Sequence, residues 1–243
     1  MILIDARDAP AQRIPENWDG QGLVVGQIAG TDQYGLATRW ETKLTVGRRQ
    51  PDGGMFRGLI LFKRGAGEHE LQSVYQGAVS LPIGRKFETK TGQITILGMM
   101  ICVPNPQNKK EYHIVVFDNA DETLDFIRRV YPGVLAGHAT APAVLAQGNY
   151  LPKERLAAWR TLVARDEARK TKRQGQFWVA GKAGTLAEVN ITGDSVQVVR
   201  FLPPVTYEEF LVSSYDDQGV LTVSSSKERW RVVNGGVEGP TKR

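Results

Sequence analysis

The stretch QITILGMMICVPNPQNKKEYHIVVF, residues 93–117, decides the fold of the first half of the chain. It holds two β-rich apolar runs, at 93–103 and 111–117, joined by PNPQNKK, whose prolines and asparagines prevent either strand from continuing. This pattern predicts an antiparallel hairpin. Because the first run is apolar almost throughout, we expect it to be buried on both faces, in the middle of its sheet.

A helix is predicted to follow this hairpin at about 120–130. Asn119 is a favourable N-cap, and Glu122 stands three residues later, where a capping box places its acidic partner. Two arginines complement the dipole of the last turn. The residues that share one helical face predict the buried stripe: Leu124, Ile127 and Val130.

The flanking segments extend the same pattern. Residues 36–46 (LATRWETKLTV) alternate with period two, and 55–63 (MFRGLILFK) resume after the turn-forming GRRQPDGG, which predicts a long hairpin. Residues 134–149 are small and uncharged, and we expect them to be a connecting segment packed against the domain. A second helix is predicted from near Pro152 to about Arg173.

From Gln176 onward the chain reads as six short strands separated by turn signals: QFWVAG, TLAEVNI, SVQVVRF, TYEEFLV, GVLTVSS and ERWRVVN. This spacing predicts a small all-β barrel or roll. The fold class is therefore α+β. We expect an antiparallel-sheet-rich α+β domain at 1–150, a basic connecting helix at 151–174 and a small all-β domain at 175–243. The hairpins with a following helix are loosely similar to an oligonucleotide-binding barrel, a fold that hosts many functions.

The composition places the chain among intracellular globular proteins. Its single cysteine, Cys102, allows no intramolecular disulfide and fits a reducing compartment. The N-terminus lacks the basic and apolar regions of a signal peptide, and no apolar run reaches the ~18 residues that a membrane span requires. We therefore expect a cytoplasmic protein without membrane contact.

The motifs that would indicate catalysis or metal binding do not match. Gly175–Ala183 has one residue too many between its glycines for a P-loop, and Gly65–Glu70 lacks the third glycine of a dinucleotide fingerprint. His69, His113 and His138 have no second ligand at metal-binding spacing, so structural or solvated histidines are expected. No serine lies in a nucleophile elbow. The sequence therefore predicts no enzyme, catalytic residue, cofactor or metal.

The charge of the chain is concentrated in one segment. Residues 153–173 hold eight basic and three acidic side chains, which equals the whole net charge of +5. Residues 39–90 form a second basic zone, with ten basic and five acidic side chains. A charge run on a helix is often only a solvated face, but here the cations outnumber the local acids, and nucleic acid is the commonest intracellular polyanion.

These charges predict a non-catalytic nucleic-acid-binding protein, a subunit of a larger nucleoprotein complex with protein partners. DNA and RNA stay open. The alternative is a structural subunit of a large assembly such as a phage particle, in which the basic helix contacts acidic proteins. Phe177 and Trp178 alternate, so we expect one ring at most to face outward and the pair to anchor the next domain. The predicted phosphate contacts are Arg165, Arg169, Lys170, Lys172 and Arg173 on the helix, and Arg48, Arg49, Lys63 and Arg64 at the first hairpin.

Overall fold

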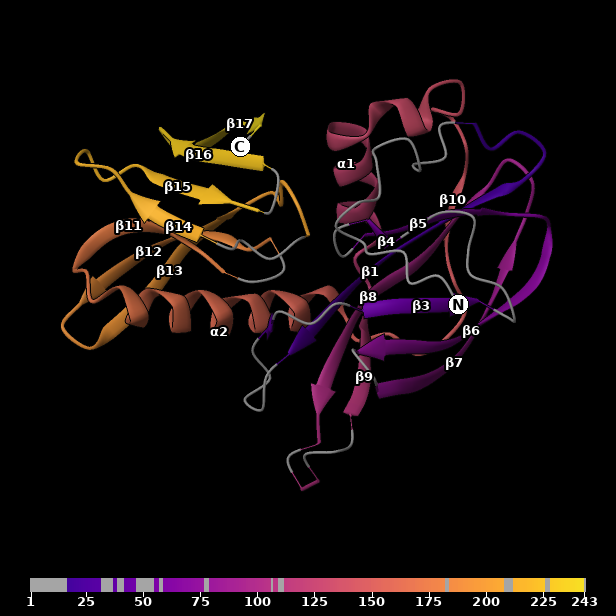
Figure 1. The fold of residues 1–243 in the computed structure, drawn as a ribbon, viewed down its shortest axis with the longest axis horizontal. Helices are drawn as coiled ribbons and strands as arrows, with labels where there is room; N and C mark the ends of the chain where they lie inside the picture. The colour runs from indigo at the N-terminus through magenta and orange to yellow at the C-terminus, as the bar shows by residue number, and fades with distance from the viewer. Residues whose placement is uncertain are drawn as a thin grey trace. The chain divides into compact units, whose positions relative to one another are not determined.

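The computed structural model of the chain describes residues 17–31, 37–38, 42–46, 55–56, 59–76, 79–105, 107–108, 112–181, 184–207, 212–225 and 228–242. The chain divides into two compact units, which are treated separately below (Figure 1). The first comprises Met1–Gly35 and Arg39–Lys153, and the second comprises Leu36–Thr38 and Glu154–Arg243. The fold is sheet-rich and broadly α+β, with two α-helices in the described part.

The larger sheet of the first unit is built on β1 (Gly22–Thr31) and β8 (Ile94–Pro104), which run parallel. β5 (Leu59–Arg64) pairs antiparallel with β1, and β4 (Met55–Phe56) pairs with β5. The far side of β8 pairs with two short partners, β9 (Tyr112–Phe117) and β10 (Ala143–Leu145). The predicted hairpin at 93–117 is confirmed as β8 and β9, and β8 is central and buried.

The second sheet of this unit has the order β3-β6-β7, all antiparallel: β3 (Thr42–Val46), β6 (Gly67–Gln76) and β7 (Val79–Thr89). The predicted hairpin between 36–46 and 55–63 is therefore wrong, because β3 pairs with β6 whereas β5 pairs with β1. Alternation correctly indicates strands here but does not select their partners. The short strand β2 (Ala37–Thr38) groups with the second unit.

The core of the first unit lies between its two sheets. Val24 and Ile28 of β1 share one buried cluster with Leu71 of β6 and Phe87 of β7. The other face of β1 meets α1 (Ala120–Val130), to which Gln27 donates a hydrogen bond. A 3-10 helix, η3 (Pro132–Leu135), continues this layer and accepts a 3.0 Å bond from the buried Trp18 indole at the Val134 carbonyl.

The bounds predicted for α1 are correct, but its cap and stripe differ from expectation. The Asn119 side chain makes no capping bond, since it is buried and donates to Gln27 on β1. The Asp118 carboxylate accepts from the Ala120 amide at 3.2 Å in its place. Of the expected stripe only Ile127 is fully buried, together with two residues that the pattern did not predict: Thr123 and Phe126.

The second unit begins with α2 (Lys153–Thr171), close to the predicted helix. A three-stranded antiparallel sheet follows: β11 (Gly175–Ala180), β12 (Leu186–Thr192) and β13 (Ser195–Leu202). A four-stranded antiparallel sheet completes the chain: β14 (Val212–Tyr215), β15 (Leu221–Ser224), β16 (Glu228–Val233) and β17 (Gly236–Lys242). Strand β17 was not predicted.

These elements form three layers, with the three-stranded sheet in the middle (Figure 1). One face of that sheet packs Phe177 and Val179 against Ala164 and Ala168 of α2. The opposite face joins Leu186 in a cluster with β15 and β16. No sheet closes into a barrel within the described ranges. The helix is therefore a layer of this unit, held by small residues that allow close approach.

Neither of the two described α-helices is long and apolar enough to cross a membrane. The longer one, α2, is charged along most of its length, and its described neighbours in the second unit are strands. Its surface is therefore the place where the basic segment of the sequence is displayed.

Candidate nucleic-acid interface

Helix α2 divides into a packed side and a solvent side. Its buried residues are Leu156, Val163, Ala164 and Ala168. The opposite side carries residues that succeed one another at alternating spacings of three and four, which keeps them in one row along a helix. All of them are exposed, and we call this row the exposed face of α2: Arg155, Ala158, Leu162, Arg165, Arg169 and, just past the last turn, Lys172.

Three cations of this face lie together at its C-terminal end. Arg165, Arg169 and Lys172 make no ion pair or hydrogen bond through their side chains with any residue that the structure describes. At 1.5 Å rise per residue, the first two are about 6 Å apart along the axis, and Lys172 lies about 4.5 Å further on. The end of α2 therefore presents three adjacent positive charges without an internal counter-charge.

Lys170 is already neutralised by its own helix. Its ammonium lies 2.5 Å from the Asp166 carboxylate and 3.0 Å from that of Glu167. Burial alone would lower the pKa of Lys170, but the hydrogen bonds to these two carboxylates outweigh it and raise the pKa. The pair at spacing i, i+4 agrees with the sequence pattern. Of the five predicted helix contacts, Lys170 therefore has least charge to offer an external anion.

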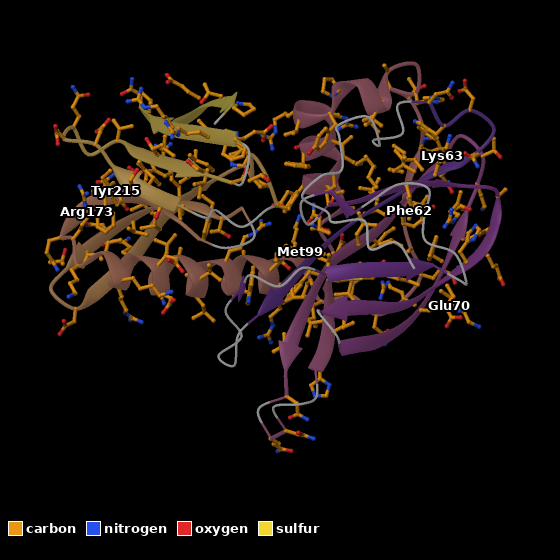
Figure 2. All side chains as sticks on the ribbon, viewed as in Figure 1. Phe62, Lys63, Glu70, Met99, Arg173 and Tyr215 are labelled. Atoms are coloured by element: carbon orange, nitrogen blue, oxygen red, sulfur yellow. The ribbon has the colours of Figure 1, made fainter. Side chains whose placement is uncertain are left out.

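Arg173 is bound within the second unit. Its guanidinium lies 4.1 Å from the ring centre of Tyr215 and 5.6 Å from that of Phe177. Figure 2 shows Arg173 and Tyr215 side by side near the end of α2. The Tyr215 hydroxyl donates to the Trp178 carbonyl at 2.7 Å, and burial raises its pKa against the opposing effect of Arg173. This arginine joins the helix end to β14.

The aromatic pair after the helix faces two different cores. Phe177 is buried against α2, and Trp178 packs toward β15 and β16, with the Arg200 guanidinium 5.2 Å from its ring. The anchoring role predicted for this pair agrees with the structure. Among the described residues the exposed large hydrophobic side chains are all aliphatic: Val144, Leu151, Leu162 and Val199. The described surface of the second unit thus offers no exposed aromatic ring.

The other predicted contacts lie away from α2 in the chain. Lys63 and Arg64 end β5 in the first unit, and both are half-buried. The Arg64 guanidinium lies 5.2 Å from the ring centre of Phe62. Figure 2 labels Phe62 and Lys63 in the first unit. Arg48 and Arg49 lie outside the described residues. Lys63 and Arg64 belong to the first unit and α2 to the second, so the candidate interface is described on α2 alone.

The motifs dismissed in the sequence lie in ordinary turns and strands. Gly181 and Gly184 belong to the connection from β11 to β12, and the Gly181 amide donates to the Thr185 carbonyl at 2.7 Å. His69 lies on β6, within 2.9 Å of the Thr89 hydroxyl, and His138 lies 3.2 Å from the Asp19 carboxylate. His113 is exposed on β9. Within the described ranges, no three acidic, histidine or cysteine side chains are grouped to hold a metal ion.

Comparison of the chain with protein-family models, with curated proteins and with solved structures found no match. The geometry of α2 therefore carries the functional argument alone. The sequence located the basic segment but did not separate its free cations from its bound ones. The acids that bind Lys170 are readable at helical spacing, whereas no local signal predicts the contact of Arg173 with Tyr215.

Proposed function

We propose that this protein binds nucleic acid without catalysing a reaction, and that it does so through the exposed face of α2 as a subunit of a larger nucleoprotein complex. One observation carries the proposal: Arg165, Arg169 and Lys172 lie in one exposed row with no carboxylate partner among the described residues. A packed helix holds them in place, since the opposite side of α2 is buried against β11–β13. A rigid row of free cations is a suitable surface for a polyanion.

The affinity of such a surface arises mainly from counterion release. Each neutralised phosphate contributes about 0.9 to the slope of log affinity against log salt on duplex DNA. Three contacts therefore predict a slope of about −2.7. Lys170 and Arg173 are left out of this count, because the first is paired with Asp166 and Glu167 and the second is stacked on Tyr215.

A second candidate is a structural subunit of a large assembly such as a phage particle, with α2 contacting an acidic protein. The position of Leu162 favours it, since this side chain is 58% exposed in the middle of the same row. Larger exposed apolar patches rimmed by charge mark protein contacts, and Leu162 is the one large apolar side chain exposed on this row. For the second unit we also keep the roll as a proposal, supported by the cluster that Leu186 shares with β15 and β16.

The test is a salt series with labelled oligonucleotides. The variant R165A/R169A/K172A removes the three free cations at the C-terminal end of the face. A matched control, K86A/K90A/R128A, removes the same charge from exposed positions of the first unit. On duplex DNA we expect the first variant to flatten the salt slope by about 2.7 and the control to keep the wild-type slope.

Equal loss in both variants would mean that net charge alone, and not α2, causes the binding. Absence of binding by the wild type at low salt would refute the nucleic-acid function. A pull-down with an acidic polypeptide such as polyglutamate would then test the assembly candidate, with the same two variants as its comparison.

A further inference from the structure

The exposed face of α2 has no amide, carboxylate or aromatic side chain with which to read or stack on a base. Its six members are three arginines, one lysine, one alanine and one leucine. Base edges are distinguished through sets of donors and acceptors, in which Asn, Gln, Asp and Glu read the bases that Arg and Lys cannot. The face has cations for phosphates but no such amide or carboxylate.

The surroundings of the face offer no stacking platform either. Single-strand binding proteins stack bases on exposed aromatic rings beside a basic groove. Here Phe177 and Trp230 are buried, and the ring of Tyr215 is covered by the Arg173 guanidinium. Trp178 is half-buried, with Arg200 over its ring. Trp159, on α2 itself, is half-buried, and no aromatic ring of the second unit is fully exposed within the described residues.

We infer that α2 takes nucleic acid by its phosphodiester backbone alone, with no base stacked or read; this inference rests on the proposed function. The row of Arg165, Arg169 and Lys172 spans about 10 Å of helix axis, which suits a few neighbouring phosphates of one strand. Both strands of a duplex and either kind of sugar present such phosphates. The ligand class is therefore any polyphosphate chain, DNA or RNA, single- or double-stranded.

The chosen probe is a pair of single strands of equal length, one of mixed sequence and one abasic throughout. Both carry the same phosphates, and only the first has bases. We expect the two affinities to agree within about threefold and the salt slopes to be equal, near −2.1 for three contacts at 0.7 each. Stacking of even one base would cost the abasic strand about 5- to 150-fold.

A second variant distinguishes charge from hydrogen-bond geometry. R165K/R169K keeps both charges but removes the planar fork that arginine uses for bidentate base contacts. We expect this variant to keep the wild-type affinity within about threefold, whereas R165A/R169A should flatten the single-strand salt slope by about 1.4, which is two contacts at about 0.7 each. Inorganic polyphosphate should displace the mixed-sequence strand completely.

The possible results distinguish backbone-only recognition from the proposed nucleic-acid binding on which it rests. Binding of the mixed strand with tenfold or greater loss on the abasic strand, or on R165K/R169K, would overturn backbone-only recognition and leave nucleic-acid binding standing. Binding of neither strand at low salt would refute the proposed function itself. Retained binding to both strands and to R165K/R169K, with competition by polyphosphate, would establish the inference.

Discussion

Replacement of Arg173 by alanine should weaken the second unit without changing its affinity for nucleic acid. The side chain lies on two rings, with the Tyr215 contact at 4.1 Å and the Phe177 contact at 5.6 Å. A half-buried cation over an aromatic face contributes about 1 kcal/mol, and the aliphatic stem adds packing. We expect Arg173→Ala to lower the free energy of unfolding of this unit by about 1.5 to 2.5 kcal/mol.

Native-state hydrogen exchange with mass spectrometry measures this change for each unit within the whole chain. Peptides from β11 and β14 should exchange about 10- to 70-fold faster in Arg173→Ala, and peptides from β8 in the first unit should not change. Arg169→Ala is the matched control, because it removes the same charge from an exposed position of the same helix. It should leave β11 unchanged and flatten the salt slope by about one.

A double-mutant cycle identifies the contact responsible. If the ring stacking causes the loss, Arg173→Ala should cost about 1 kcal/mol less in a Tyr215→Leu background than in the wild type. The reasoning would be refuted if Arg173→Ala left exchange in β11 and β14 unchanged and reduced the salt slope as Arg169→Ala does. Arg173 would then be a phosphate contact, as the sequence alone predicts.

Three further changes test other parts of the structure. Gly98→Ala should lower the free energy of unfolding, measured in urea, by about 2 to 4 kcal/mol, because φ is +81° and the new methyl would lie 2.6 Å from the Phe117 carbonyl oxygen. The matched control is Gly92→Ala, which has a similar φ of +71° but open space around the new methyl, and it should lower this free energy by only about 1 kcal/mol. Glu188 has a lowered pKa, through its hydrogen bond from Gln176 and then through Arg200, so its stabilising effect is present above the unfolded pKa and lost as pH falls through the folded one. The difference in unfolding midpoint between wild type and Glu188→Gln should therefore shrink below about pH 4; a constant difference from pH 6 to pH 3 would contradict this. Lys170→Ala should change the salt slope by less than about 0.3, because Asp166 and Glu167 already neutralise this charge. A flattening by one full unit would show that Lys170 leaves these carboxylates and contacts a phosphate.

Local chemistry determined much of the fold. The hairpin of β8 and β9, both α-helices and most C-terminal strands follow from periodicity and turn residues within a few positions of each other. Strand β1 was missed because its glycine-rich sequence has low strand propensity, and long-range pairing with β5 and β8 makes it a strand. At Gly26 an added Cβ would lie 3.0 Å from the Cβ of Leu97, so close approach requires the glycine that obscured the pattern.

The features of the candidate site also fall into those that the sequence predicts and those that only the tertiary structure shows. By itself the sequence determined that the basic excess lies on one helix and that Lys170 has acids at helical spacing, since both depend on neighbours within about one turn. Only the tertiary structure decided that Arg173 stacks on Tyr215, a residue that belongs to the last sheet, and that the row ending in Lys172 faces solvent. Burial and ring contacts depend on which distant strands meet, because the packing of one face determines which cations remain free on the other.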